Sequence, residues 1–401
     1  MSNSLSEGLA RPSVRPADPR FSSGPCKKHP GWRADQFTTE NLGFSHRAPA
    51  QKAHIEDVVR RSGELLGLPK DWRLALVPAS DTGALEMALW SLLGPRGVDA
   101  LVWDSFSADW AQDIQTQLKL DDVSVLEADY GSLPELSAVD GDRDVVFVYN
   151  GTTSGVRVPD LSWVDPNRAG LTICDATSAV YAMPIDYDKL DVVTWSWQKA
   201  LGGEAGFGML ALGPRAVDRL NTHTPAWPMP KIFRLTKNGK INESIFRGST
   251  INTPSLLAID DLQSALDWAD SLGGLQALHD RSQRNQQVLA SWVDQSDWVD
   301  WLADRKEWRS STSMCFKITH PQFQSLTESG QRKAVSSLCQ SLAAEGVAFD
   351  VAGYRAAPPG LRIWGGATVE ASDLESLTHW LDWAFLNWLN TTAKDESDGT
   401  T

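Results

Sequence analysis

The chain has 401 residues, of which 42% are hydrophobic and 22% are charged, and this size and composition are typical of a soluble globular protein of two domains. Its formal net charge of −14 argues against nucleic acid or an anionic membrane surface as a main partner. We find no signal-peptide core, no apolar run of membrane-spanning length, and no metal-binding or CxxC spacing among the four cysteines. We therefore expect a cytoplasmic protein with reduced thiols and no metal.

Short apolar runs alternate with helical patterns through the first part of the chain. The runs are rich in β-branched residues and mostly continuous, which is typical of strands buried on both faces of a parallel sheet. Segments between them, such as residues 82–94, have apolar positions at helical spacing. Strands that alternate with helices predict an α/β domain with a doubly wound, mostly parallel sheet. The predicted strands are residues 74–78, 100–104, 144–150, 170–176 and 191–197.

The pattern changes near residue 254, where a long helical stretch begins that Gly273 and Gly274 interrupt. Separated strand candidates follow, and then a C-terminal helix for which Ser372 is the expected N-cap, with Glu375 three residues on. These elements predict a smaller α+β domain. The strand candidates are residues 313–319, 346–351 and 361–365. The expected organisation is a flexible segment over 1–18, a large cofactor domain over 19–270, a small domain over 271–391 and a disordered tail over 392–401.

The most informative segment is WSWQKALGGEAGFGML, residues 195–210. It places Lys199 directly after a predicted buried strand and before a glycine-rich turn. Most lysines are solvated, but here the flanks are apolar and the glycines let other groups approach the backbone closely. Desolvation favours the neutral amine, which is the nucleophile that a Schiff base with pyridoxal 5′-phosphate (PLP) requires.

A second candidate, Asp175, ends the predicted strand before the one that leads to Lys199. In open α/β sheets, ligands bind at the carboxyl ends of the strands. A buried carboxylate there can keep the pyridine nitrogen of PLP protonated. An aspartate in this position alone is more often a cap or turn residue, so the cofactor role depends on its pairing with the lysine segment.

The segment VPASDTGALEMALW, residues 77–90, opens a predicted helix with small polar residues. Free N–H groups and the positive end of the helix dipole make such an end a phosphate cradle. Ser80, Asp81 and Thr82 equally suit an ordinary capping motif, so both interpretations stay open. The chain contains no GxGxxG or GxxxxGK[ST] pattern that would favour a dinucleotide or a nucleoside triphosphate.

Taken in order, these segments resemble the phosphoserine aminotransferase family, which consists of class V, fold-type I PLP enzymes. The sequence as a whole resembles the divergent branch of that family. The resemblance covers residues from about 19 to 390. The motifs that carry it are FSSGPC (21–26), GFSHRA (43–48), YNGTTSG (149–155), CDATSA (174–179), WQKALGG (197–203), INTPS (251–255) and GLRIWGG (360–366).

The resemblance implies a role for each matching residue around the cofactor. Lys199 carries the cofactor and moves a proton, and Asp175 pairs with the ring nitrogen. Ser80 and Asp81 supply backbone amides to the phosphate, although the family's usual glycine-rich cradle is replaced here. Gln198 reaches the phosphate as well.

Other matching residues complete the cofactor site. Thr152 contacts the ring hydroxyl or the substrate, and Asn252 and Thr253 reach the phosphate across a dimer interface. The ring needs a stacking aromatic residue, which Phe106 supplies. Two alternatives for the stacking residue are Trp103 and Trp110.

For the substrate, the resemblance implies that Arg362 holds the α-carboxylate, a planar bidentate match that lysine does not make. Ser23 adds a hydrogen bond. His46, Arg47 and Arg355 form the cationic cluster that an acidic protein needs to bind a phosphorylated substrate. A solvated loop position is an equally good interpretation of Arg355.

The resemblance therefore implies a homodimeric PLP aminotransferase of serine biosynthesis. It would exchange an amino group between L-glutamate and 3-phosphohydroxypyruvate, giving O-phospho-L-serine and 2-oxoglutarate in a ping-pong cycle. The longer phosphorylated substrate of pyridoxine biosynthesis stays open. The alternatives are an alanine–glyoxylate or serine–pyruvate aminotransferase, a cysteine desulfurase, which no suitably placed cysteine supports, and a non-catalytic PLP-fold binding protein, which would have lost Lys199 or Asp175.

Overall fold

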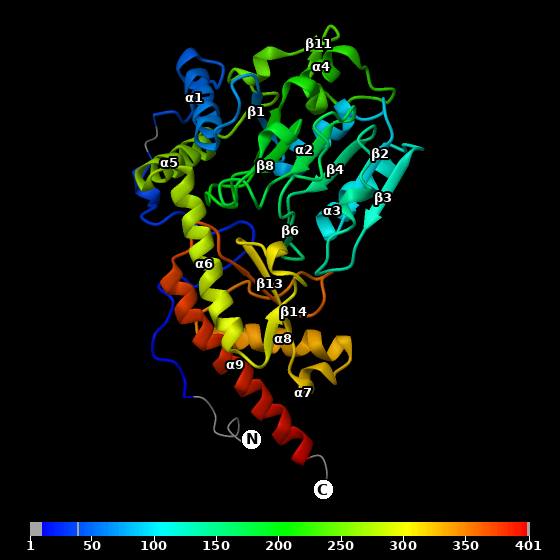
Figure 1. The fold of residues 1–401 in the computed structure, drawn as a ribbon. Coiled ribbons are helices and arrows are strands. Elements are labelled where there is room, and N and C mark those ends of the chain that lie inside the picture. Colours follow the sequence, from blue (N-terminus) through cyan, green and yellow to red (C-terminus); the bar gives the residue numbers. More distant parts are fainter. Residues whose placement is uncertain (1–9, 38–39, 399–401) are drawn as a thin grey trace.

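The computed structural model describes residues 10–37 and 40–398, with the side chains of 392–398 excepted. In this part of the chain, a seven-stranded sheet forms the centre of the upper lobe in Figure 1, in the order β1-β9-β8-β7-β4-β2-β3. Strands β8, β7, β4, β2 and β3 are parallel, and β9 runs antiparallel to both of its neighbours. The strands are β1 (Arg73–Pro78), β2 (Val98–Val102), β3 (Val123–Glu127), β4 (Asp144–Val148), β7 (Thr172–Asp175), β8 (Val192–Ser196) and β9 (Phe207–Leu212).

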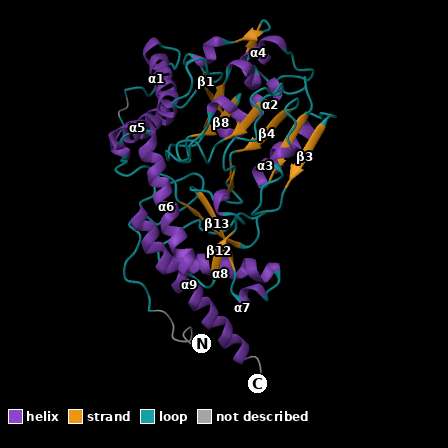
Figure 2. Ribbon diagram, in the orientation of Figure 1, coloured by secondary structure: helices purple, strands orange, loops and turns teal. Residues whose placement is uncertain are grey.

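Helices surround this sheet, and Figure 2 shows them in purple around the orange strands. Helix α2 is buried on most sides and packs against β1, β8 and β9. The large-lobe helices are α1 (Pro49–Leu66), α2 (Ser80–Leu92), α3 (Ser105–Gln112), α4 (Pro214–Thr222) and α5 (Leu256–Leu272). Minor elements are the hairpins β5 (Asn150–Gly151) with β6 (Val156–Arg157) and β10 (Thr236–Lys237) with β11 (Lys240–Ile241), a π-helical turn η2 (Asp113–Gln117), and the 3₁₀ turns η1 (Ala34–Gln36), η3 (Leu136–Ala138), η4 (Tyr187–Lys189), η5 (Lys231–Phe233), η6 (Glu243–Phe246) and η7 (Lys306–Trp308).

The architecture agrees with the α/β fold expected from the sequence. The five predicted strands correspond to β1, β2, β4, β7 and β8, and the predicted mostly parallel α/β sheet is confirmed. Strands β2, β4 and β8 are buried at every position, which explains their continuous apolar sequences. The edge strand β3, which is only partly buried, and the antiparallel β9 were not among the predicted strands.

The lower lobe contains an antiparallel sheet in the order β12-β13-β14, beneath which α8 and α9 pack together. Its hydrophobic core is separate from that of the large sheet and includes Phe21 and Cys26 from the N-terminal part of the chain. The elements are α6 (Leu275–Gln295), β12 (Val299–Trp301), β13 (Ser313–Ile318), α7 (Pro321–Gln324), α8 (Glu328–Ala344), β14 (Gly360–Trp364) and α9 (Ala371–Asp398).

Two predictions in this lobe were wrong. Residues 346–351 form no strand, because Gly346 and Asp350 have left-handed φ angles of 66° and 59° that break an extended conformation. Ser372 does not cap the last helix, because that helix already begins at Ala371. The expected interruption after residue 272 is confirmed, since Gly273, in the left-handed region, separates α5 from α6.

The structure describes parts of both chain ends that were expected to be flexible. Residues 10–18 lie against α9, where the Val14 carbonyl accepts from Trp380 Nε1 at 2.7 Å and the Ala17 N–H donates to Asp373 Oδ1 at 2.7 Å. Helix α9 continues to Asp398, beyond the expected end at residue 391. Residues 1–9 and 399–401 lie outside the described residues.

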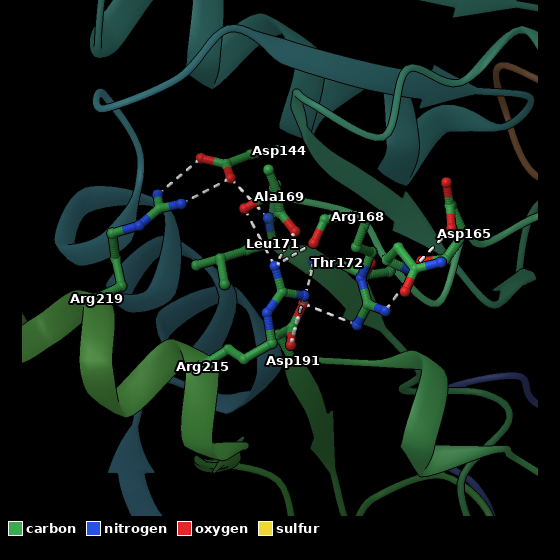
Figure 3. A network of polar contacts seen from close by, with 11 residues as sticks. Asp144, Asp165, Arg168, Ala169, Leu171, Thr172, Asp191, Arg215 and Arg219 are labelled. Carbon is green, nitrogen blue, oxygen red and sulfur yellow. Dashed lines mark hydrogen bonds and ion pairs between the residues drawn. The ribbon is translucent and has the colours of Figure 1, made fainter.

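The amino ends of the parallel strands carry buried ion pairs (Figure 3). Asp144, the first residue of β4, accepts from Arg219 of α4 at 2.9 Å. Asp191, directly before β8, lies 3.0 Å from both Arg168 and Arg215. These pairs lie at the end of the sheet opposite the candidate site described below.

Candidate active site

Lys199 and Asp175 lie together at the carboxyl ends of two adjacent strands. Asp175 is the last residue of β7, and Lys199 follows the neighbouring parallel strand β8 in a turn. The Lys199 Nζ donates a hydrogen bond to the carbonyl of Ser23. Gly24 comes so close that a Cβ placed there would lie 2.4 Å from this nitrogen. The N-terminal segment therefore closes over the lysine, a contact that the sequence analysis did not predict.

The surroundings of Lys199 favour its neutral form. Burial lowers the pKa of the Lys199 amine, and nearby Arg362 adds to this effect, while Cys26 and Asp175 oppose it. A neutral amine is the form that attacks a carbonyl carbon. The arrangement is therefore chemically suited to forming a Schiff base.

Asp175 is 7% exposed and accepts hydrogen bonds from uncharged donors. Its Oδ2 accepts from Trp110 Nε1 at 3.1 Å, and its Oδ1 accepts from the Thr177 N–H at 2.9 Å. Within the described residues no arginine, lysine or histidine forms an ion pair with it. A buried carboxylate without a cationic partner is suited to receive a cationic group of a ligand.

The indole of Trp110 is thus a partner of the carboxylate, a role that sequence reasoning missed. Trp110 lies four residues after Phe106 on α3, so both residues share one face of that helix. Phe106 packs beside Tyr354, with ring centroids 6.1 Å apart. Trp103 is buried and donates its N–H to the Val156 carbonyl at 3.1 Å. This spacing on α3 could have indicated that Trp110 reaches the strand ends.

The N-terminus of α2 faces the same edge of the sheet. Ala79 and Ser80 adopt left-handed φ angles of 67° and 52°, and their N–H groups donate to the Gly206 carbonyl at 3.0 and 3.4 Å. The N–H groups of Asp81 and Thr82 lie in the first turn and have no partner within the helix. These groups and the positive end of the helix dipole suit an anion such as a phosphate.

Two further predicted residues lie within this region. The Gln198 Oε1 is buried and has no hydrogen-bond partner in the described part of the chain. Thr152 is 6% exposed, and its hydroxyl donates to Ser178 Oγ at 2.9 Å.

Arg362 and Ser23 approach from the small lobe and the N-terminal segment. Arg362 lies on β14, its Nε is buried without a partner, and its guanidinium carbon is 5.5 Å from the centre of the Tyr354 ring. It forms no ion pair with any residue that the structure describes. Ser23 is buried, and its Oγ accepts from Ser313 Oγ at 3.4 Å.

The remaining predicted residues are not hydrogen-bonded to this buried cluster within the described residues. His46 is buried in the loop before α1, where burial and then Arg47 lower the pKa of its imidazole. Arg47 is exposed beside it, and Arg355 is exposed in the loop before β14. Asn252 and Thr253 are exposed directly before α5. A single chain therefore leaves these groups open to a ligand or a second copy.

Comparison with known proteins places the chain in a family. Residues 129–357 match the family model described as aminotransferase class-V. The chain is 54% identical over 375 residues to the phosphoserine aminotransferases of Methanosarcina mazei and of Methanosarcina barkeri, in each case over 94% of this chain and 99% of the relative. The chain belongs to the phosphoserine aminotransferase family. A crystal structure of the Cytophaga hutchinsonii phosphoserine aminotransferase shares the fold, with a TM-score of 0.76 and 19% identity over 91% of this chain and 98% of that one.

Members of this class V family use PLP, which is therefore the cofactor of the chain. The residues present fit this group. A buried carboxylate without a cation suits the protonated ring nitrogen, and the Lys199 amine with its lowered pKa suits the carbonyl carbon. The open first turn of α2 offers N–H donors to a phosphate. The Gln198 side-chain amide has no hydrogen-bond partner at its buried oxygen in the described part of the chain, so this amide is free to turn its NH₂ group toward the phosphate as a further donor.

The structure contains no membrane-spanning helix among the residues it describes, because none of these helices is both long and apolar enough. It also contains no group of three or more histidine, cysteine, aspartate or glutamate side chains placed to hold a metal ion, within the same residues.

Proposed function

We propose that the chain transfers an amino group between L-glutamate and 3-phosphohydroxypyruvate, forming O-phospho-L-serine and 2-oxoglutarate in serine biosynthesis. Its near full-length identity of 54% to two phosphoserine aminotransferases is the observation that carries this proposal. The Lys199 amine beside a carboxylate without a cation supports amino transfer rather than a binding function.

In this proposal, PLP supplies an electron sink that makes the proton on the substrate α-carbon removable. Lys199 would hold the cofactor through its Nζ, and the same amine would be the base that moves this proton. Asp175 would keep the ring nitrogen protonated. Phe106 would supply an aromatic face to the ring, and Thr152 would contact the ring hydroxyl or the substrate.

The phosphate of the cofactor would lie at the N-terminus of α2. The backbone N–H group of Asp81 and the side-chain amide of Gln198 would bind it, and the Ser80 N–H group would join them by giving up its 3.4 Å hydrogen bond to the Gly206 carbonyl. Asn252 and Thr253 would reach it from a second copy of the chain. Their exposure in the single chain supports this arrangement, and within the described residues neither side chain is hydrogen-bonded to the buried cluster.

For the substrate, Arg362 would bind the α-carboxylate with its planar guanidinium, and Ser23 would add a hydrogen bond. His46, Arg47 and Arg355 would bind the phosphate of the substrate. The absence of any carboxylate partner for the three arginines among the described residues supports these roles, since each guanidinium is available to an anion.

The proposal includes a cytoplasmic homodimer. Asn252 and Thr253 directly precede α5, and exposed apolar side chains lie near the start of this helix. They are Leu42 at 40%, Phe44 at 62% and Leu257 at 47% exposure. Such side chains suit burial against a second copy. The four cysteines are all free, which is typical of a reducing compartment.

A subunit-mixing experiment tests the dimer. Lys199→Ala chains and chains with both Asn252→Ala and Thr253→Ala should each be inactive, and exchange of subunits should restore part of the activity because one site in each hybrid is intact. No recovery after verified exchange would place both motifs in the same subunit's site.

A coupled assay of 2-oxoglutarate formation from L-glutamate tests the reaction itself. The panel of keto acids would include 3-phosphohydroxypyruvate, its longer phosphorylated analogue from pyridoxine biosynthesis, glyoxylate and pyruvate. We expect turnover with 3-phosphohydroxypyruvate to exceed that with the acids that lack a phosphate. Higher turnover with glyoxylate or pyruvate would favour the alanine–glyoxylate or serine–pyruvate activity instead.

A further inference from the structure

Two buried carboxyl groups meet at the site, although the proposed function uses only one of them. Asp81 is 6% exposed and Asp175 is 7% exposed. Asp81 lies in the first turn of α2, and its side chain points inward to the ends of β7 and β8, where it interacts with Asp175 and Thr194. Its Oδ1 is buried without a hydrogen-bond partner of ordinary geometry among the described residues.

The position of Asp81 is set by close backbone packing. A Cβ placed on Gly208 of β9 would lie 2.1 Å from the Ser80 carbonyl, so the first turn of α2 contacts the strand directly. A Cβ on Gly83 would lie 2.1 Å from the Pro78 carbonyl. This close packing of the first turn of α2 places the Asp81 carboxyl group beside Asp175.

The charges around the pair do not support two anions. Neither carboxylate forms an ion pair within the part of the chain that the structure describes. Lys199 faces both groups, but burial lowers the pKa of its amine. The thiol of Cys174, the residue before Asp175 on β7, adds no second charge, because burial and then the two carboxylates raise its pKa well above the usual range. Burial, and then the neighbouring Asp175, raise the pKa of Asp81 well above that of an ordinary carboxyl group.

We propose that Asp81 carries a proton and donates it in a hydrogen bond to Asp175, so that the pair presents one negative charge to the cofactor's ring nitrogen. Asp81 is then a positioning residue that acts through Asp175. Together with Trp110 Nε1 and the Thr177 N–H, it provides a third donor that orients the Asp175 carboxylate. This inference rests on the proposed role of Asp175 and is independent of which keto acid the enzyme uses.

Infrared spectroscopy of the holoenzyme without substrate tests the protonation directly. We expect a carbonyl stretching band of a protonated, buried carboxylic acid that shifts in D₂O and disappears in Asp81→Asn. Asp109→Asn, which changes an exposed aspartate on neighbouring α3, is the control and should retain the band. A spectrum that is the same in the wild type and in Asp81→Asn would show that Asp81 is ionised and would overturn the proposal.

Neutron diffraction of the deuterated holoenzyme needs no variant and therefore remains decisive if Asp81→Asn does not fold. A deuteron on Asp81 directed at Asp175 is the expected result, and a deuteron-free Asp81 is the opposite one.

Cofactor affinity tests the positioning role. The dissociation constant for PLP, measured by quenching of tryptophan fluorescence, should rise by about tenfold in Asp81→Leu, the scale for losing a hydrogen bond to a charged group. Asp81→Asn should recover part of this loss, because its amide can donate to Asp175 from nearly the same place. Equal losses in both variants would assign Asp81 to packing alone. These measurements contain no substrate, so failure of the keto-acid panel would sink the proposed function and leave this inference unaffected.

Discussion

Buried carboxylates have different partners at the two ends of the large sheet. At the amino ends of the strands each buried aspartate is paired with at least one arginine, at distances of 2.6 to 3.0 Å. At the carboxyl ends no buried aspartate forms an ion pair with an arginine or lysine within the described residues, and Asp104 and Asp175 accept hydrogen bonds from uncharged donors. The amino-end group is Asp99, Asp144 and Asp191, and the carboxyl-end group is Asp81, Asp104 and Asp175.

The aspartates at the amino ends therefore have a structural role, whereas the carboxyl groups at the carboxyl ends are available to a ligand. A buried ion pair satisfies both partners during folding, and removing one partner leaves the other charge buried and uncompensated. A buried carboxylate without a cation costs folding free energy that ligand binding can offset. Asp104 follows this pattern, since burial raises the pKa of its carboxyl group although Ser107 and Thr153 donate to it. The comparison therefore predicts opposite effects of substitutions at the two ends.

The largest expected effect is the loss of catalysis in Lys199→Ala, on the order of 10⁴-fold or more, because the residue that binds the cofactor and moves the proton is removed. Borohydride should fix the cofactor on Lys199 in the wild type, and a peptide map locates it. Lys189→Ala is the control at the amino end, where the Lys189 Nζ donates to the Val164 carbonyl at 2.9 Å. Reduced cofactor on any lysine other than Lys199 would contradict the assignment.

The second prediction contrasts Asp175→Asn with Asp144→Asn. Asp175→Asn should lower kcat on the order of 10³-fold, because the charge that stabilises the protonated ring is lost. It should also raise the unfolding free energy of the cofactor-free protein by about 1 kcal/mol, because the variant no longer buries a carboxylate that has no cationic partner.

Asp144→Asn should instead lower that unfolding free energy by about 3 kcal/mol, because the buried Arg219 loses its charged partner, and should leave turnover per folded molecule unchanged. Urea unfolding and steady-state kinetics of both variants make the comparison. Equal destabilisation by the two substitutions would mean that Asp175 is a structural carboxylate like Asp144.

The third prediction concerns arginines without a carboxylate partner. Arg47→Ala should lower kcat/KM for O-phosphoserine, with a loss of transition-state stabilisation of about 2–4 kcal/mol. This is the scale for removing a charged hydrogen-bond partner of a buried anion. Arg362→Ala should affect all amino donors alike, because they share the α-carboxylate. Kinetics with O-phosphoserine and alanine separate the two. Equal losses for both donors in Arg47→Ala would move the phosphate site, with Arg355 the first residue to test.

The smallest expected effect concerns Asp18, a partly buried aspartate that is paired with cations like the aspartates at the amino ends of the strands. Burial opposes ionisation of Asp18, but Arg20 and Lys27 outweigh it and lower its pKa from 3.8 to about 2. Because the folded pKa is depressed, the stabilisation is present above the unfolded pKa and is lost as pH falls toward about 2. Asp18→Asn should therefore lower stability by about 1 kcal/mol at neutral pH.

Thermal unfolding at several pH values measures this difference, which should shrink as the pH falls toward 2. Asp35→Asn provides the matched control, since Asp35 forms the same kind of pair with Arg33 on the exposed surface and should show no measurable change. A constant difference between wild type and Asp18→Asn at all pH values would exclude the ion pair as its cause.

The sequence by itself determined five of the seven strands of the large sheet, the mostly parallel character of that sheet and the place of the chemistry. Continuous β-branched runs are strands with two covered faces, and parallel strands have their carboxyl ends on one edge. That rule alone places Asp175 and Lys199 at the same edge, where they lie side by side. The glycines after residue 272 likewise end a helix through local backbone conformation, which needs no tertiary contact.

Only the tertiary structure decided which side chains meet at that edge. The inward direction of Asp81 depends on the packing of α2 on β9, and the bond from Trp110 to Asp175 depends on how α3 lies over the strand ends. The Ser23 carbonyl reaches Lys199 from far along the sequence. Residues 346–351 have the apolar content of a strand. A strand also needs a neighbouring strand and an extended backbone, and the left-handed φ angles in this segment prevent the latter. Hydrophobic periodicity is a property of each segment alone, but these contacts arise from the relative placement of segments.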